Sequence, residues 1–157
     1  MIKTNNPMPS GKLSQLKDGN IINHNTDELF ANKKIVIFGL PGAFTPTCSA
    51  AHLPGYVVSA NELKAKGVDA IICLSVNDAF VMHAWGEAQN AENIMMLADG
   101  DASYTKALGL TMETAGFGGL RSQRYAMVIE NGIVTNLHVE KAKEFEVSTA
   151  EAILKAL

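Results

Sequence analysis

The feature that most constrains this chain is an apolar run that passes directly into a turn rich in proline and glycine. Residues 35–38 are all apolar, and Pro41-Gly42-Ala43-Phe44-Thr45-Pro46-Thr47-Cys48-Ser49 follows them closely. A short apolar run bounded by turn residues is typical of a buried β-strand. The segment from about residue 48 to residue 66 reads as a helix. Cys48 is therefore expected in the first turn of a helix, at the carboxyl end of a strand.

This position favours chemistry at the sulfur of Cys48. The first amides of a helix have no partners within the helix, and the helix dipole places partial positive charge there. Both features favour a thiolate over a thiol, and the thiolate is the nucleophilic form. Thr45 and Thr47 flank the sulfur with hydroxyl groups, and Pro46 suits a helix start because it has no amide to donate.

A plainer interpretation makes Cys48 a small core residue, because free cysteines are among the residues most often buried. Two prolines, a glycine and two threonines crowd the predicted turn, and such residues suit a site better than a core. We therefore interpret Cys48 as a candidate nucleophile. For Thr45 the plainer role is turn and cap chemistry, and both roles are compatible.

The rest of the pattern alternates strands with helices. Strands are expected at residues 68–76, 94–98, 125–129 and 133–139, with a weaker one at 20–25, and helices at 79–89, 103–108 and 148–157. Pro54-Gly55 should kink or bulge the helix after Cys48. This order predicts an α/β fold with a central mixed β-sheet flanked by helices on both faces.

Local signals complete this prediction. Residues 1–20 read as an extended or irregular lead-in, and residues 114–119 read as a glycine-rich loop without the lysine of a phosphate-binding loop. Asn131-Gly132 indicates a type I′ hairpin turn. Helix caps are expected at Thr26, at Asn77 or Asp78, and in a capping box that begins at Ser148.

Composition and charge exclude several classes of function. The 157 residues suit a single domain, and a net charge of −3 with only two arginines leaves no basic patch for nucleic acid. No apolar run approaches the roughly 18 residues of a membrane span. Residues 1–20 lack the apolar core of a secretory signal, so a cytoplasmic protein with reduced thiols is expected.

A histidine near Cys48 suggests a different kind of site. His52 lies four residues after Cys48, and a Cys–His pair can indicate a hydrolase or a metal site. The other three histidines have no ligand spacing between them, and Pro54 disturbs the helical register. We therefore expect no metal and no cofactor, and we expect His52 to be a partly buried structural residue.

Taken together, these segments resemble the peroxiredoxins, and within them the type II, peroxiredoxin-5-like group. The resemblance lies in the nine-residue stretch that ends at Ser49, followed by His52-Leu53-Pro54-Gly55. Further matches fall, in the family's order, at residues 74–82, 84–86, 97–100, 106–110 and 124–128. The resemblance runs from about residue 7 to the end of the chain, and it implies a thioredoxin-like fold and the reduction of hydroperoxides.

The resemblance also implies residue roles. Cys48 corresponds to the peroxidatic cysteine, and Thr45 to the residue whose hydroxyl bonds both the thiolate and the peroxide. Pro41 corresponds to the residue that packs over the site and shields it. Arg124 corresponds to the arginine that contacts the thiolate, although an arginine just before a strand is more commonly a solvated charge.

The second cysteine departs from part of the group. Some members resolve the sulfenic acid with a cysteine near the C-terminus, but residues 139–157 contain none. Cys73 lies in a strand that reads as buried, so core packing is the expected role. We predict a one-cysteine cycle recycled by glutathione with glutaredoxin. The alternatives are resolution by Cys73 with recycling by thioredoxin, and a redox sensor that oxidises a client protein through a mixed disulfide.

The resemblance finally implies a homodimer that meets near the active-site loops. Phe44, Phe80 and Trp85 are the aromatic residues expected at such an interface.

Overall fold

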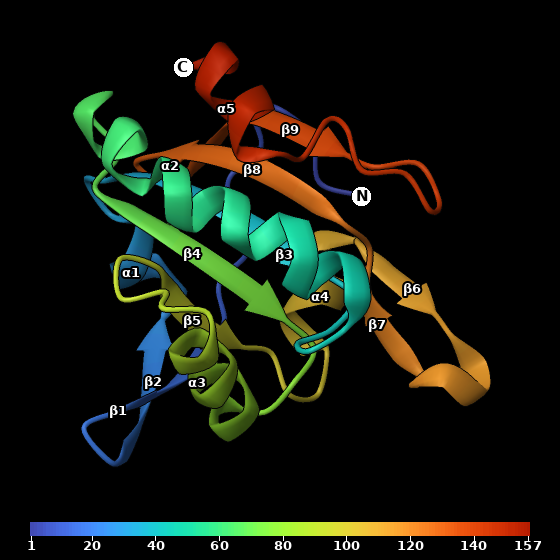
Figure 1. The fold of residues 1–157 in the computed structure, drawn as a ribbon. Coiled ribbons are helices and arrows are strands. Elements are labelled where there is room, and N and C mark those ends of the chain that lie inside the picture. The colour runs from blue at the N-terminus through green and yellow to red at the C-terminus, as the bar shows by residue number, and fades with distance from the viewer.

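One large mixed β-sheet organises the molecule. The structure is a computed structural model that describes residues 1–157. The seven strands run in the order β2-β1-β5-β4-β3-β8-β9, so that β4 is the middle strand (Figure 1). β4 pairs in parallel with β3 and β5, whereas β8 and β1 join the sheet in antiparallel orientation. The strands are β1 (Lys12–Lys17), β2 (Asn20–Asn25), β3 (Lys34–Leu40), β4 (Ala70–Ser75), β5 (Met95–Ala98), β8 (Tyr125–Glu130) and β9 (Ile133–Val139).

Helices cover both faces of this sheet. α2, α3 and α5 pack on one face, where their apolar residues join one buried cluster, and α1 and α4 contribute to a second cluster on the other face (Figure 1). The helices are α1 (Thr26–Phe30), α2 (Leu53–Ala65), α3 (Ala79–Ala88), α4 (Ser103–Leu108) and α5 (Ala150–Ala156). None of them combines the length and the apolar character that crossing a membrane requires.

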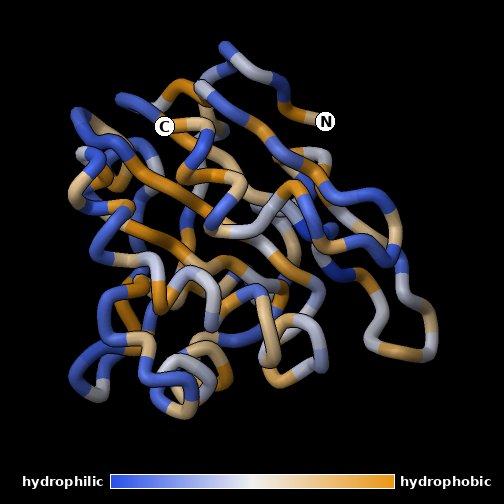
Figure 2. Tube along the Cα trace, turned by 45° about the horizontal axis from the view of Figure 1, so that its top comes forward, coloured by the Kyte–Doolittle hydropathy of each residue, from blue (hydrophilic) through white to orange (hydrophobic).

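The alternation of side chains along β3 explains why the two clusters are separate. Val36 and Phe38 belong to the cluster under α2 and α3, whereas Ile35 and Ile37 belong to the cluster under α1 and α4. Successive side chains of a strand point to opposite faces, so a strand that is covered on both faces is apolar throughout. Figure 2 shows hydrophobic stretches through the middle of the molecule and mostly hydrophilic loops outside. The predicted mixed sheet between two helical layers is confirmed.

The interpretation of residues 1–20 as an irregular lead-in was wrong for β1. Lys12–Lys17 forms a hairpin with β2 and joins the edge of the sheet beside β5. The turn consists of Asp18 and Gly19, whose φ angles are 51° and 79°. Asp-Gly is a strong two-residue hairpin signal because both positions need positive φ. The strand buries few side chains besides Leu13, which explains why its sequence shows little apolar periodicity.

The glycine-rich segment is also more ordered than predicted. β6 (Thr111–Glu113) and β7 (Leu120–Ser122) form a small separate hairpin, and the 3-10 turn η2 (Ala115–Phe117) lies at its tip. Strands of only three residues, most of them partly exposed, carry too few side chains to show a periodic pattern. Asn131 and Gly132, by contrast, adopt the positive φ angles that a type I′ turn requires, as predicted.

The helix caps agree with the sequence in part. Asp78 caps α3 with a side-chain bond to the Val81 amide, as predicted. α1 is capped by Asn25 and not by Thr26, and α5 is capped by Thr149 and not by Ser148. The displaced caps have other partners, because the Thr26 and Ser148 side chains are buried and hydrogen-bonded within the fold.

Candidate active site

The turn between β3 and the following helix is held by its own hydrogen bonds. β3 ends at Leu40, and residues 41–47 lead into the π-helical turn η1 (Cys48–His52). The Thr45 hydroxyl donates to the Gly42 carbonyl oxygen at 2.7 Å, and the Thr45 carbonyl accepts from the Ser49 amide at 2.9 Å. Cys48 therefore lies in the first turn of a helical segment at the carboxyl end of a strand, as predicted.

The helix after Cys48 bulges before it becomes regular. The Leu53 amide donates to the Cys48 carbonyl oxygen, five residues back, where an α-helix would bond four residues back. Pro54 has no amide proton, so it cannot continue the α-helical ladder at this point. The helix is disturbed as predicted, but the π-helical turn lies at Cys48–His52, just before Pro54-Gly55, which belong to the regular helix α2. Such turns are frequent at functional sites, and this one contains Cys48 at its start and His52 at its end.

Arg124 contacts the sulfur of Cys48. Cys48 is fully buried, and the Nη2 of Arg124 donates a hydrogen bond to its Sγ at 3.1 Å. Arg124 immediately precedes β8, which pairs with β3, so the sheet brings the guanidinium to the end of the strand that leads to Cys48. A guanidinium at this distance from the sulfur can also donate to a negatively charged oxygen of a bound ligand.

His52 supports the other edge of the same guanidinium. The Nη1 of Arg124 lies 2.9 Å from His52 Nδ1, and His52 Nε2 lies 3.1 Å from the Ser148 carbonyl oxygen. A carbonyl oxygen only accepts and a guanidinium only donates, so the imidazole carries its proton on Nε2 and accepts at Nδ1. Burial, together with the charge of Arg124, lowers the pKa of His52 to about 3, which keeps the ring neutral at physiological pH.

The segment after β9 closes over this arrangement through Glu140. Its Oε2 accepts hydrogen bonds from the Glu146 amide, the Ser148 amide and the Ser148 hydroxyl at 2.7 to 2.9 Å. Burial alone would raise the pKa of Glu140, but the bonds from Ser148 and Glu146 outweigh it and hold that pKa below its ordinary value. Glu140 is only 8% exposed, and its Oε1 is buried without a partner. The bonds to Oε2 fix the position of the Ser148 carbonyl.

A pocket of about 530 Å³ opens onto the outer side of this site. Pro41, Thr47 and Arg124 form the part of its wall nearest the active-site turn. The rest of the lining comes from Thr111, Met112, Gln123, Glu140, Lys141, Ala142, Lys143, Glu144 and Phe145. The arrangement as a whole is a buried sulfur, a guanidinium donor and an access pocket, which suits attack by a thiolate on a small polar molecule.

Comparison with known proteins identifies the family. Residues 3–154 match the Redoxin family. Peroxiredoxin-2D of Arabidopsis thaliana is 53% identical over 81% of this chain and 80% of its own, and the chloroplastic peroxiredoxin-2E-2 of Oryza sativa is 45% identical over 99% and 72%. The crystal structure of reduced Prx3 from Vibrio vulnificus in complex with hydrogen peroxide is 67% identical, covers 99% of both chains and superposes with a TM-score of 0.98. The chain belongs to the Redoxin family and is a peroxiredoxin.

These matches confirm the resemblance found in the sequence and the thioredoxin-like fold. The peroxiredoxins are thiol peroxidases. In this peroxiredoxin the fold brings Arg124 to the sulfur of Cys48, and Pro41 and Arg124 line the same pocket. Thr45 belongs to the same turn, and its hydroxyl donates to the Gly42 carbonyl. That bond leaves the lone pairs of the Thr45 oxygen available to accept a further hydrogen bond.

Cys73 and Trp85 are core residues of this peroxiredoxin. Cys73 lies within β4 and is fully buried. Its burial, and to a smaller extent the nearby Cys48, raise the pKa of its thiol well above the usual value. Trp85 is also fully buried, and its Nε1 donates to the Ser49 hydroxyl at 3.0 Å. Trp85 therefore cannot contact a partner subunit directly, and that part of the interface prediction was wrong.

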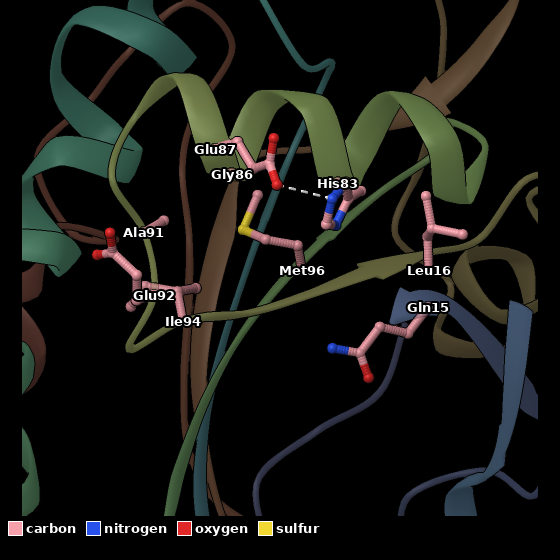
Figure 3. A pocket seen from close by; sticks show the side chains of 9 residues that line it. All are labelled: Gln15, Leu16, His83, Gly86, Glu87, Ala91, Glu92, Ile94 and Met96. Atoms are coloured by element: carbon pink, nitrogen blue, oxygen red, sulfur yellow. Dashed lines mark ion pairs between the residues drawn. The ribbon is translucent and has the colours of Figure 1, made fainter. Parts of the chain in front are cut away.

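A second pocket of about 360 Å³ lies between α3, β1 and β5 (Figure 3). His83 and Glu87 form an ion pair of 3.0 Å on its helical side, and the Glu87 side chain is largely exposed whereas that of His83 is partly exposed. No group of three metal-ligating side chains occurs anywhere in the chain. The polar side chains that line this pocket, those of Gln15, His83, Glu87 and Glu92, are all at least partly exposed.

Sequence reasoning missed three members of the site. His52 was expected to be partly buried and structural, but it is fully buried and bonds to Arg124. Glu140 and Ser148 carried no signal, because an acidic residue after a strand and a serine before a helix have common surface roles. Only the fold brings them to His52.

Proposed function

We propose that this peroxiredoxin is a one-cysteine peroxidase in which Cys48 attacks hydrogen peroxide and alkyl hydroperoxides. The observation that carries the proposal is the 3.1 Å hydrogen bond from Arg124 Nη2 to the buried Sγ of Cys48. Hydrogen peroxide as a substrate is supported by its presence in the similar Vibrio vulnificus Prx3 structure. The pocket beside Pro41 and Thr47 provides the entry route.

The chemical step transfers one peroxide oxygen to sulfur. The Cys48 thiolate attacks that oxygen, the O–O bond breaks, and its electron pair leaves with the second oxygen as hydroxide or alkoxide, which takes a proton from water. The sulfur is oxidised to a sulfenic acid and the peroxide is reduced. Fixed donors aimed at the departing oxygen are the strongest way to lower the barrier. We assign this task to the Arg124 guanidinium and to the Thr47 and Cys48 amides.

Pro41 and Thr45 complete the assignment. Pro41 lies in the pocket wall beside Arg124, where its ring limits the access of water to the sulfur. Exclusion of water strengthens the hydrogen bonds to the reacting oxygen. The Thr45 hydroxyl, which donates to Gly42, can accept a hydrogen bond from the peroxide OH. In this role it orients the substrate for in-line attack.

We propose that glutathione and glutaredoxin regenerate the thiol. The glutathione sulfur attacks the sulfenic sulfur and releases water, and a second thiol then reduces the resulting mixed disulfide. This route is supported by the state of Cys73, which is fully buried within β4 and whose raised pKa keeps it protonated. A protonated thiol is a poor nucleophile. Both cysteines are free thiols, which suits a reducing compartment such as the cytoplasm.

A second candidate cycle forms a disulfide between Cys48 and Cys73, with thioredoxin as the reductant. It is favoured by one observation, that both cysteines belong to the same buried cluster. The cycle would require β4 or η1 to open, because both sulfurs are inaccessible to thioredoxin in the folded chain.

We also propose a homodimer that uses the exposed aromatic residues beside the site. Phe44 is 58% exposed and Phe80 is 62% exposed, and the Phe44 ring lies 6.4 Å from that of Trp85. Phe80 lies on α3, the helix that also carries Trp85, and large exposed aromatic side chains favour an interaction surface. Light scattering at micromolar concentration tests this proposal, and a monomeric mass would contradict it.

The deciding experiment for the cycle measures steady-state peroxide reduction with two reductant systems. One contains glutathione, glutaredoxin and glutathione reductase, and the other contains thioredoxin and its reductase. We expect Cys48→Ser to be inactive and Cys73→Ser to remain active with glutathione. Loss of thioredoxin-supported turnover in a folded Cys73→Ser variant would favour the disulfide cycle. No turnover with either system would favour a sensor that oxidises a client protein.

A further inference from the structure

We infer that His52 is a positioning residue that holds the guanidinium of Arg124 against Cys48. The inference rests on the proposed roles of Cys48 and Arg124, and it assigns to His52 a part in the reaction without contact with the peroxide. It is drawn from a continuous chain of hydrogen bonds that runs from Cys48 Sγ through Arg124 and His52 to the Ser148 carbonyl oxygen.

The side chain of Arg124 has only two hydrogen-bond partners. Nη2 donates to Cys48 Sγ at 3.1 Å, and Nη1 donates to His52 Nδ1 at 2.9 Å. The two nitrogens belong to one rigid plane, so a bond that fixes one also fixes the direction of the other. The second edge of the guanidinium would lack an acceptor without His52, and the long arginine side chain would be free to leave the sulfur.

A backbone carbonyl of a different segment fixes the proton of His52 on Nε2. Nε2 donates to the Ser148 carbonyl, and the Tyr56 hydroxyl donates to the same oxygen at 2.8 Å. Glu140 Oε2 closes the loop that presents this carbonyl. The imidazole therefore offers Nδ1 as an acceptor in its neutral form. A protonated ring would instead present a donor and a charge to the guanidinium.

Packing alone does not require an imidazole here. The ring lies among the aromatic rings of Phe38, Tyr56 and Phe145, with centroid separations of 5.1, 5.7 and 5.2 Å. An apolar side chain of similar size would fill this space equally well. Phe145 also lies under the guanidinium carbon of Arg124, 5.7 Å from it. The distinctive property of His52 among these rings is its acceptor at Nδ1.

The test compares His52→Asn, His52→Gln and His52→Leu in single-turnover oxidation by hydrogen peroxide, followed by stopped flow. Asparagine places its amide oxygen near the position of Nδ1 and still accepts from Arg124. Glutamine places its oxygen near Nε2, and leucine has no acceptor. We expect the rate constant to fall by about 10- to 100-fold in the Gln and Leu variants, and by less than about 3-fold in the Asn variant.

A second readout separates positioning from stability. We expect the pH dependence of Cys48 alkylation by iodoacetamide to move to higher pH in the Gln and Leu variants only. Tyr56→Phe is the matched control, because it removes a hydrogen bond from the same Ser148 carbonyl but none from Arg124. This control should lower the unfolding temperature without changing the rate or the pH dependence.

Each outcome decides the inference. Equal rates in all folded His52 variants would overturn it, and so would equal losses in Asn, Gln and Leu with an unchanged pH dependence. If the Leu variant does not fold, the Asn and Gln pair decides alone. Cys48→Ser is measured in the same assay, so that residual oxidation in this variant would reject the proposed function and not the inference about His52.

Discussion

At the scale of single residues, the shape of the Arg124 side chain matters as much as its charge. Arg124→Lys keeps the charge but presents an ammonium group that cannot span Cys48 Sγ and His52 Nδ1 together. We expect the single-turnover rate with hydrogen peroxide to fall by about 100-fold, the size of effect seen when one donor of an oxyanion site is lost. Stopped-flow fluorescence measures this rate.

The chain contains one other arginine, which provides the control. Arg121 donates to the carbonyl oxygens of Gly118 and Val76, and neither it nor those carbonyls bond to Cys48. Arg121→Lys should lower stability slightly and leave the oxidation rate near that of the wild type. Similar losses in both variants would show that the guanidinium shape at Arg124 has no specific role.

Gly39 is required by the close approach of an aromatic ring. A Cβ atom at Gly39 would lie 2.2 Å from Cε1 of Tyr125, its neighbour across the β3–β8 pair. We expect Gly39→Ala to lower the free energy of unfolding by about 1 to 3 kcal/mol, because an overpacked core must shift to accept the methyl group. Urea denaturation measures the change.

Gly55 provides a control of the opposite sign. It lies inside α2, and a Cβ there would meet no atom within 4 Å. Gly55→Ala should stabilise the fold by about 0.5 to 1 kcal/mol, because alanine loses less conformational entropy than glycine in a helix. Equal unfolding midpoints for Gly39→Ala and the wild type would contradict the proposed steric conflict.

At the scale of elements, the sequence predicts best where burial and periodicity coincide. β3 and the turn to Cys48 were predicted because a doubly covered strand must be apolar and a reactive turn needs proline and glycine. β1 was missed because its partner strand and an Asp-Gly turn hold it at a sheet edge, with only one fully buried side chain. The caps of α1 and α5 were misplaced by one residue, since adjacent capping residues compete and tertiary contacts decide between them.

The cap of α5 is a prediction at this scale. The Thr149 hydroxyl accepts from the Ala152 amide at 3.0 Å, so Thr149→Ala removes a cap and should lower the free energy of unfolding by about 1 kcal/mol. Thr149→Ser retains the hydroxyl and should remain close to the wild type in urea denaturation. If Thr149→Ala leaves the free energy of unfolding unchanged, Ser148, the residue that the sequence favoured, is the cap instead.

At the scale of the whole molecule, the site is assembled from segments that are distant in the chain. Arg124 bonds to Cys48 across 76 residues, and His52 bonds to Ser148 across 96 residues. No local pattern in a single sequence reports such pairs, so the partners of His52 could not be predicted before the fold was known. The family resemblance supplied Arg124, but it assigned no role to the residues that hold Arg124 in place.

The same buried histidine links the fold to pH. Burial and Arg124 lower the pKa of His52 to about 3 in the folded chain, whereas the unfolded chain titrates near 6.5. Between these values the unfolded state binds more protons, so stability falls as the pH decreases, by up to about 1.4 kcal/mol per pH unit for one proton. The loss begins below pH 6.5 and continues towards pH 3. Glu140, whose folded pKa is also lowered, adds a loss in the same direction at more acidic pH.

His52→Asn removes this proton-binding group from both states. We therefore expect the difference in unfolding free energy between pH 7 and pH 5, measured by urea denaturation, to be smaller in His52→Asn than in the wild type by about 1 to 2 kcal/mol. His83→Asn is the control, because His83 lies at the surface and pairs only with Glu87. An identical pH difference in the wild type and His52→Asn would mean that the folded chain accepts a proton at His52. The ring would then present a donor to Arg124, and the hydrogen-bond chain that reaches Cys48 would hold only above that pH.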